Sequence, residues 1–185
     1  AAAIGASAIW WWGYRSSVPP AGAPVFAAIP FAGRPLPPPF GTPEVAISAD
    51  ASSVAFISTA GLEIRRMDSK DTITVATGMA SNPFFSPDGD WIALFLQTAL
   101  AKVPVRGGAP VMLWTTTDRP AGGDWRADGT IVFATSEALY RMSADGGEPQ
   151  VIARPARDRK EIQYAWPQFL PGGDSIIFTI VSSDP

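Results

Sequence analysis

The sequence predicts an all-β fold built of short antiparallel strands, and three observations lead to this prediction. A similar unit recurs at intervals of about 40 residues from residue 44 onward. Each unit contains a tight turn of the Asp-Gly type, and apolar residues alternate along the segments on both sides of that turn. Strands joined by tight turns give meander sheets, so each unit is expected to be one four-stranded antiparallel sheet.

The recurring unit is clearest at residues 85–94, which read Phe-Ser-Pro-Asp-Gly-Asp-Trp-Ile-Ala-Leu. The Asp carboxylate accepts backbone hydrogen bonds and Gly takes a positive φ, so this pattern predicts a hairpin turn between two strands. Related segments occupy residues 47–56, 125–133 and 169–178. The first has Ala51 in place of the turn Gly, and the last has Gly172 in place of Asp.

Further strands are predicted after each turn. Third strands are expected at residues 64–67, 100–103 and 139–142, and fourth strands at residues 111–113 and 151–152. A unit of four strands and about 40 to 45 residues is the size of one blade of a β-propeller.

Three columns of apolar residues recur at fixed places in the unit and are expected to fill the space between neighbouring sheets. A sheet that is apolar on both faces is not stable alone, so the units must pack on one another. The columns are Ile47, Phe85, Trp125 and Phe169; Val54, Ile92, Ile131 and Ile176; and Phe56, Leu94, Phe133 and Phe178.

The predicted fold is therefore a partial β-propeller of about three to four four-stranded blades, preceded by the remnant of a membrane helix. We expect blades at residues 44–80, 81–118, 119–160 and 161–185, the last of them incomplete. Closed propellers usually have four to eight blades, which favours a piece of a larger ring. The alternative is a small four-bladed ring that residues 24–31 complete with one strand.

The first 43 residues differ from the rest in composition. Residues 1–14 carry no charge, and Trp10, Trp11, Trp12 and Tyr14 stand where a membrane helix would leave the hydrocarbon layer. We expect residues 1–15 to be the end of a transmembrane helix, with a signal-peptide remnant as the alternative. Residues 16–43 hold nine prolines and are predicted to form an extended spacer with one edge strand at 24–31.

Composition limits the chemistry that this chain can perform. The sequence contains no Cys and no His, which excludes catalytic triads with His, thiolate nucleophiles and metal sites built from these residues. The net charge of -3 gives no basis for nucleic-acid binding. The carboxylates of residues 86–91 belong to a turn, and Asp88 with Asp90 is too small a ligand set for calcium. We expect no enzymatic activity, no cofactor and no metal.

The repeated Ser-x-Asp-Gly-x-x-Ile-Ala-Phe pattern resembles the WD-repeat-like propeller repeat of the TolB family. The order of the motifs is similar to the extracytoplasmic half of certain bacterial membrane-anchored serine/threonine kinases. The matching segments are residues 23–30, 100–110, 139–149 and 166–173. The resemblance implies a kinase domain before residue 1, whereas the sequence itself contains none of the kinase motifs. Relatives carry a His shortly before the Trp-Pro pair, where this chain has Gln163, Tyr164 and Ala165.

We therefore expect a membrane-tethered, extracytoplasmic propeller that recognises or senses a ligand. The ligand would be a protein, a peptide or a cell-wall fragment. The alternatives are a TolB-like envelope scaffold for protein partners and a propeller that gates a hydrolase domain elsewhere in the parent chain. Polar connections between units and the aromatic residues near them are the candidate ligand contacts. These candidates are Asp118, Arg119, Asp124, Trp125, Arg157, Arg159, Tyr164 and Trp166.

Overall fold

The computed structural model describes residues 45–97, 99–172 and 175–183. These residues belong to the second of two compact units into which the chain divides, residues 34–185. They form strands and one short 3₁₀ helix, η1 (Arg157–Arg159). The predictions of a membrane helix at 1–15, a spacer at 16–43 and a strand at 24–31 lie outside the described residues. Within the described part of the chain, no helix has the length and apolar character needed to cross a membrane.

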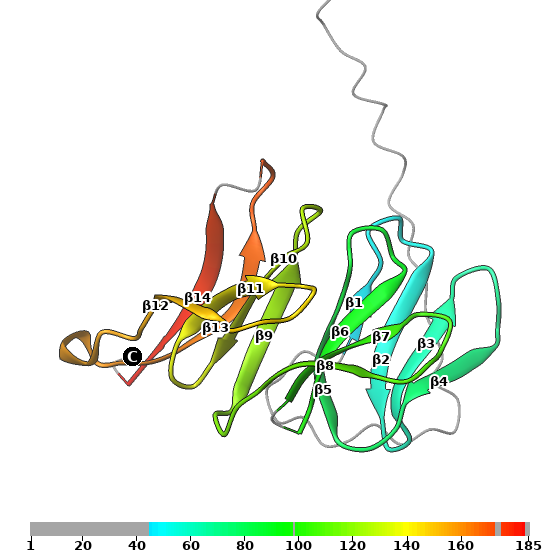
Figure 1. The fold of residues 1–185 in the computed structure, drawn as a ribbon, viewed down its shortest axis with the longest axis horizontal. Coiled ribbons are helices and arrows are strands. Elements are labelled where there is room, and N and C mark those ends of the chain that lie inside the picture. The colour runs from blue at the N-terminus through cyan, green and yellow to red at the C-terminus, as the bar shows by residue number, and fades with distance from the viewer. Residues whose placement is uncertain (1–44, 98, 173–174, 184–185) are drawn as a thin grey trace, which may run out of the picture. The chain divides into compact units, whose positions relative to one another are not determined.

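The strands form four antiparallel sheets, and in each sheet they follow one another in chain order (Figure 1). The first sheet contains β1 (Val45–Ile47), β2 (Ser53–Ser58), β3 (Gly61–Arg66) and β4 (Thr72–Ala76). The second contains β5 (Ala80–Phe85), β6 (Trp91–Leu96), β7 (Ala99–Pro104) and β8 (Val111–Thr115). The third contains β9 (Pro120–Trp125), β10 (Thr130–Thr135), β11 (Leu139–Ser143) and β12 (Gln150–Ala153). In the fourth, the described strands are β13 (Glu161–Phe169) and β14 (Ile176–Ser182). The predicted all-β fold of propeller type is confirmed.

Side-chain alternation along the second strands determines how successive sheets pack. In β6, Ile92 and Leu94 pack into an apolar cluster with β2 and β3 of the first sheet. Ala93 and Phe95 point to the opposite face and pack with Ile131 and other residues of the third sheet. The second sheet is thus apolar on both faces, as the recurring columns predict.

The same alternation links the third sheet to the fourth. Val132 and Ala134 of β10 pack with Tyr164 and Ala165 of β13 in a third apolar cluster. The neighbouring residues on the strand, Ile131 and Phe133, face the second sheet instead. In β6 and β10, alternate side chains therefore pack against the preceding sheet, and the side chains between them pack against the following sheet.

The three column residues of the first sheet, Ile47, Val54 and Phe56, belong to no described interface between sheets, because the β2 residues that pack against the second sheet are Ala55 and Ile57. Ile47 is 63% exposed, whereas Phe85 is buried between the first and second sheets. Trp125 and Phe169 also pack against apolar clusters that include the preceding sheet. The column faces the preceding sheet in each case, and among the described residues no sheet precedes the first one. The expectation that these three residues of the first sheet lie between sheets is therefore wrong for the described part of the chain.

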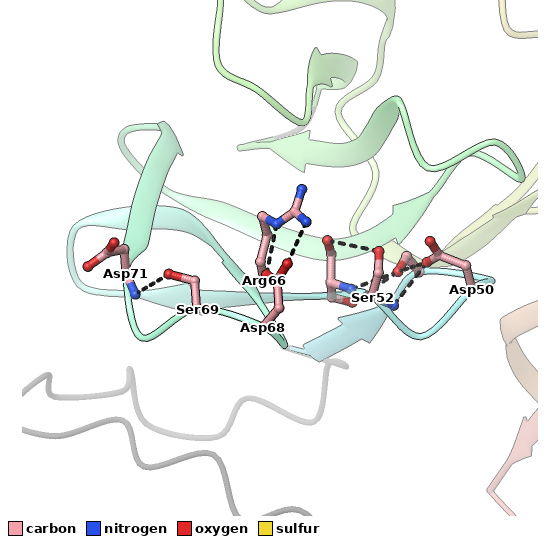
Figure 2. A network of polar contacts seen from close by, with 8 residues as sticks. Asp50, Ser52, Arg66, Asp68, Ser69 and Asp71 are labelled. Carbon is pink, nitrogen blue, oxygen red and sulfur yellow. Dashed lines mark hydrogen bonds and ion pairs between the residues drawn. The ribbon is translucent and has the colours of Figure 1, made fainter.

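The Asp turns are formed as the sequence predicts. In the first turn, Asp50 Oδ1 accepts from the Ser52 backbone N–H at 2.9 Å and from the Ser48 hydroxyl at 2.6 Å. Figure 2 shows this turn together with the Arg66–Asp68 and Ser69–Asp71 contacts of the β3–β4 connection. Asp88 accepts from the Asp90 backbone N–H in the second turn.

The third turn also contains the Asp carboxylate, but its side-chain partner differs from that in the first two turns. Asp128 accepts from the Thr130 backbone N–H at 2.9 Å, while Arg126 replaces the serine and pairs with Asp128. Hydrogen bonds from the Arg126 side chain and from the Thr130 backbone N–H favour the ionised carboxyl group and lower the pKa of Asp128. In the three turns that contain Asp, the carboxylate accepts the equivalent backbone N–H, and the side-chain donor differs between them.

Replacing Ala51 with Gly should stabilise the protein by about 1 kcal/mol, because Ala51 occupies the left-handed region at φ 56° where a Cβ is unfavourable. Gly89 and Gly129 take positive φ at the same place in the next two turns. Urea unfolding of the Ala51→Gly variant measures the effect. Ala49→Gly in the same turn is the control and should destabilise, because Ala49 is not among the residues with positive φ. Equal effects of the two substitutions would contradict the prediction.

Protonating the turn carboxylates should destabilise the fold in acid. Hydrogen bonds from Ser48 and Ser52 lower the pKa of Asp50 to about 2, and bonds from Ser86 and Asp90 lower that of Asp88. A carboxyl group with a depressed folded-state pKa stabilises the protein fully above its unfolded-state pKa, near 4, and loses this contribution as the pH falls through the folded-state value.

We expect the free energy of unfolding to fall between about pH 4 and pH 2, and the Asp50→Asn/Asp88→Asn/Asp128→Asn variant to show a shallower fall. Asn keeps an oxygen that accepts the backbone N–H, so the comparison isolates the charge. Urea unfolding at a series of pH values measures the slope. Asp158→Asn on η1 serves as the single-carboxylate control. A triple variant with the wild-type slope would show that these turns do not set the acid limit.

Candidate functional site

The first strands of successive sheets lie side by side and line an open cavity. β1 contacts β5, β5 contacts β9, and β9 contacts β13. Residues of all four strands line a cavity of about 540 Å³, which we call the first-strand cavity. Each of these strands stands at the end of its sheet, so one edge of each has no partner strand within that sheet. The volume is in the range typical of ligand-binding pockets.

A backbone irregularity recurs on three of the lining strands. Asn82, Gly122 and Trp166 have φ values of 52°, 96° and 50°, all in the left-handed region. Each stands six residues before the position of the turn Asp or its replacement Gly172. The register between the first and second strands shifts nearby in all three sheets. Bulges of this kind re-aim side chains and are common beside functional sites.

Asn82 is the most unusual residue of the cavity lining. It is 2% exposed, and among the residues that the structure describes neither its Oδ1 nor its Nδ2 has a hydrogen-bond partner. Leaving a buried polar group unsatisfied costs about 1 to 3 kcal/mol. Such groups are rare in folded proteins, and each one calls for an explanation.

Two glycines allow the lining strands to approach one another closely. A Cβ on Gly122 would lie 3.0 Å from both Cα and Cδ1 of Trp166, and a Cβ on Gly123 would lie 2.7 Å from the Phe84 ring. Neither position has space for a side chain. The glycine pair of β9 therefore fixes the spacing between β5, β9 and β13.

Asp124 ties β9 to β13 through its carboxylate. Its Oδ1 accepts from the Trp125 backbone N–H at 2.9 Å, and its Oδ2 accepts from the Phe169 backbone N–H at 2.8 Å. The carboxylate thus satisfies a backbone donor on the neighbouring sheet. Asp124 is the one ionisable side chain among the described residues that line the first-strand cavity.

The structure brings together three of the eight predicted contact residues. Asp124, Trp125 and Trp166 line the first-strand cavity, and Trp166 is 40% exposed. Asp118 and Arg119 lie in the connection between β8 and β9 and are not part of this lining. The remaining three residues belong to a separate cluster on η1 and β13.

That separate cluster is held by Glu161. Glu161 Oε2 accepts from the Ala156 backbone N–H at 2.7 Å and lies 2.8 Å from the Tyr164 hydroxyl, while Oε1 pairs with Arg159 at 2.9 Å. These partners lower the pKa of Glu161, and the carboxylate in turn raises the pKa of Tyr164. Tyr164 is 5% exposed and Arg157 donates to the Ile162 carbonyl, so the cluster fastens η1 to β13.

Asn82 and Gln168 line the cavity and were not among the predicted contacts. A signal for Asn82 exists in the sequence, because Asn82-Pro83 and Trp166-Pro167 occupy equivalent places in the unit. Among the described residues, no group of three or more His, Cys, Asp or Glu side chains is arranged to hold a metal ion. The arrangement offers hydrogen bonds and aromatic surface to a ligand.

Comparison with known proteins supports the fold. No protein-family model and no curated protein matches the sequence. A chain of a nidogen–laminin complex superposes with a TM-score of 0.62 at 10% identity, over 75% of this chain and 56% of that chain. An oligogalacturonate lyase from Vibrio parahaemolyticus gives a TM-score of 0.58 at 13% identity, over 78% of this chain and 48% of the lyase. The chain thus spans about half the length of these proteins, which have β-propeller-like folds.

A TolB chain from Agrobacterium tumefaciens gives a TM-score of 0.41 at 18% identity, over 76% of this chain and 70% of that chain. The propeller-like fold is common to the structural neighbours, and the resemblance to kinase-associated propellers stays a prediction.

Proposed function

We propose that this chain is a β-propeller recognition module that binds a ligand in the first-strand cavity. The observation that carries the proposal is the buried, unpartnered amide of Asn82 in the cavity lining. A ligand that supplies a donor and an acceptor there recovers the energy that the unliganded structure forfeits. The left-handed bulge that positions Asn82 recurs at Gly122 and Trp166, so this backbone conformation is a general feature of the repeated sheet. The carboxamide, in contrast, occurs at only one of these three positions.

The composition of the lining also supports binding. Trp125 and Trp166 offer large apolar surfaces that lose little conformational freedom when a ligand packs on them. Apolar walls with a small number of placed polar groups are typical of ligand sites. The fold shared with a chain of a nidogen–laminin complex is compatible with a protein-binding role for this chain.

Substitution of Trp166 tests the site. We expect Trp166→Asn to weaken ligand binding about tenfold or more, because it removes an exposed ring from the cavity lining. Asn tolerates the left-handed backbone, as Asn82 demonstrates at the equivalent position. Thermal unfolding in the presence of synthetic decapeptide pools and soluble cell-wall saccharides identifies the probes that raise Tm.

Met112→Ala, at an exposed position of β8, is the control and should leave both Tm shifts and affinity unchanged. The proposed site is refuted if the probes bind Trp166→Asn as tightly as wild type but bind Met112→Ala more weakly. That result would place the binding surface elsewhere.

We also propose that the module is tethered to the membrane through residues 1–15 and lies on the extracytoplasmic side, as the receptor part of a bacterial serine/threonine kinase. The uncharged stretch before Arg15 and its Trp cluster support the tether. The motif order supports the kinase context. A kinase domain encoded upstream would agree with the kinase context, and a hydrolase in the same chain would favour the gating role. If the parent chain encodes neither domain, the envelope scaffold is favoured.

Membrane association and orientation can be measured together in bacteria. Alkaline phosphatase fused after residue 185 of the parent protein, with the complete helix in place, should be active and should sediment with membranes, because the enzyme folds only outside the reducing cytoplasm. Deletion of residues 1–15 should release the fusion from the membrane fraction. An inactive fusion, or one that sediments equally without residues 1–15, would contradict this assignment.

A further inference from the structure

We infer that the first-strand cavity takes an extended peptide, and that Asn82 holds the main chain of one peptide residue. This inference rests on the proposed function and names the class of ligand. Three features of the described residues lead to it. They are the chemistry of the Asn82 amide, the free edges of the lining strands, and the shortage of charged and hydroxyl groups in the lining.

The amide of Asn82 matches the main chain of an extended residue. A carboxamide presents one acceptor oxygen and an NH₂ donor side by side. In an extended chain, the N–H and C=O of a single residue point to the same side, which is how antiparallel strands exchange two hydrogen bonds between opposite residues. One such residue can therefore donate to Oδ1 and accept from Nδ2 of Asn82 once the amide turns toward the cavity. Among the described residues neither atom has a hydrogen-bond partner, and both are closed to solvent as the side chain stands.

The strand edges offer further main-chain partners. β1, β5, β9 and β13 each have one edge that is unpaired within their own sheet, and residues of all four line the cavity. Peptides commonly bind by adding a strand to such an edge, where main-chain hydrogen bonds supply affinity. One backbone donor of these strands, the Phe169 N–H, is already taken by Asp124.

The charge of the lining argues against an anionic ligand. None of the described residues of the lining is Lys or Arg, and the Asp124 carboxylate would repel a phosphate or a carboxylate. A cation would find only this one carboxylate, and both of its oxygens already accept backbone hydrogen bonds. A neutral group is therefore the best match for the part of the ligand that lies in the cavity.

A saccharide could stack on Trp125 and Trp166, but it would bring many hydroxyl groups. Each hydroxyl that loses water needs a new partner, or the complex loses free energy. The Ser86 hydroxyl of the lining is already bonded to Asp88 and to the Trp91 backbone. The other polar side chains of the described lining that can bond a neutral ligand are the carboxamides of Asn82 and Gln168. Two carboxamides are too few hydrogen-bonding partners for a sugar ring, but they are sufficient for one or two peptide units.

Selection from a random dodecapeptide phage library against the protein, covering residues 1–185, tests the inference. We expect linear peptides to be recovered, and we expect Asn82→Gly to weaken their binding about tenfold or more. Gly suits the left-handed φ of this position and is the natural residue at the equivalent position 122. Urea unfolding of the variant establishes that it is folded.

A change in the peptide tests the same contact without altering the protein. N-methylation of one backbone nitrogen should weaken binding to wild type about tenfold, and the same methylation should have little further effect on Asn82→Gly. This loss of additivity is specific to a main-chain contact with Asn82. Met112→Ala should bind every peptide as wild type does.

The inference is overturned if no peptide is recovered, or if N-methylation and Asn82→Gly act independently at every peptide position. Trp166-dependent binding of the cell-wall saccharides, with no peptide recovered, would overturn the peptide class and leave the proposed function intact. Failure of both the peptide library and the saccharides to bind would refute the proposed function as well.

Discussion

The structure depends on apolar packing between successive sheets, because none of the sheets is sufficient alone. In β6 and β10, alternate side chains point to opposite faces, and each face is covered by a different neighbouring sheet. Lys102 adds a polar connection between the second and third sheets, since its Nζ donates to the Ala144 carbonyl at 2.8 Å and lies 4.9 Å from the centre of the Trp91 ring. The same alternation accounts for the 55% exposure of Ile177 in β14, because no described sheet covers that face.

The position of the first-strand cavity follows from this packing. Neighbouring sheets approach most closely at their first strands, where β9 meets β5 and β13 around glycine positions. Apolar side chains of the second and third strands fill the space between the sheets. Gly122 and Gly123 bring the strands together, and Asp124 then bridges to the backbone of β13. The cavity walls are thus held by the same interfaces that stabilise the sheets, so the site is largely formed before a ligand arrives.

Local chemistry explains which features could be predicted from the sequence. The turns were predictable because Asp and Gly have specific roles there, and Ala51 adopts the predicted left-handed conformation despite lacking the glycine. Strand β4 was not predicted, because Thr72–Ala76 is short, polar at its start and without a glycine pair before it. Asn82 was missed although its Pro-preceding place matches that of Trp166, because its burial without a partner among the described residues is visible only in three dimensions. Trp125 and Trp166 were found because aromatic residues near polar connections are common contact residues.

The contrast between Asn82, Gly122 and Trp166 separates what the fold requires from what the ligand requires. All three residues have the same left-handed backbone at the same place in the unit. Gly is the residue that this conformation favours, and Asn is tolerated, whereas Trp is strained there. A fold selected only for stability would place Gly at each position. The strained Trp166 and the unsatisfied Asn82 each lower stability, and the two side chains belong to the lining of one cavity. Two independent costs at one site are best explained by a ligand that uses both residues.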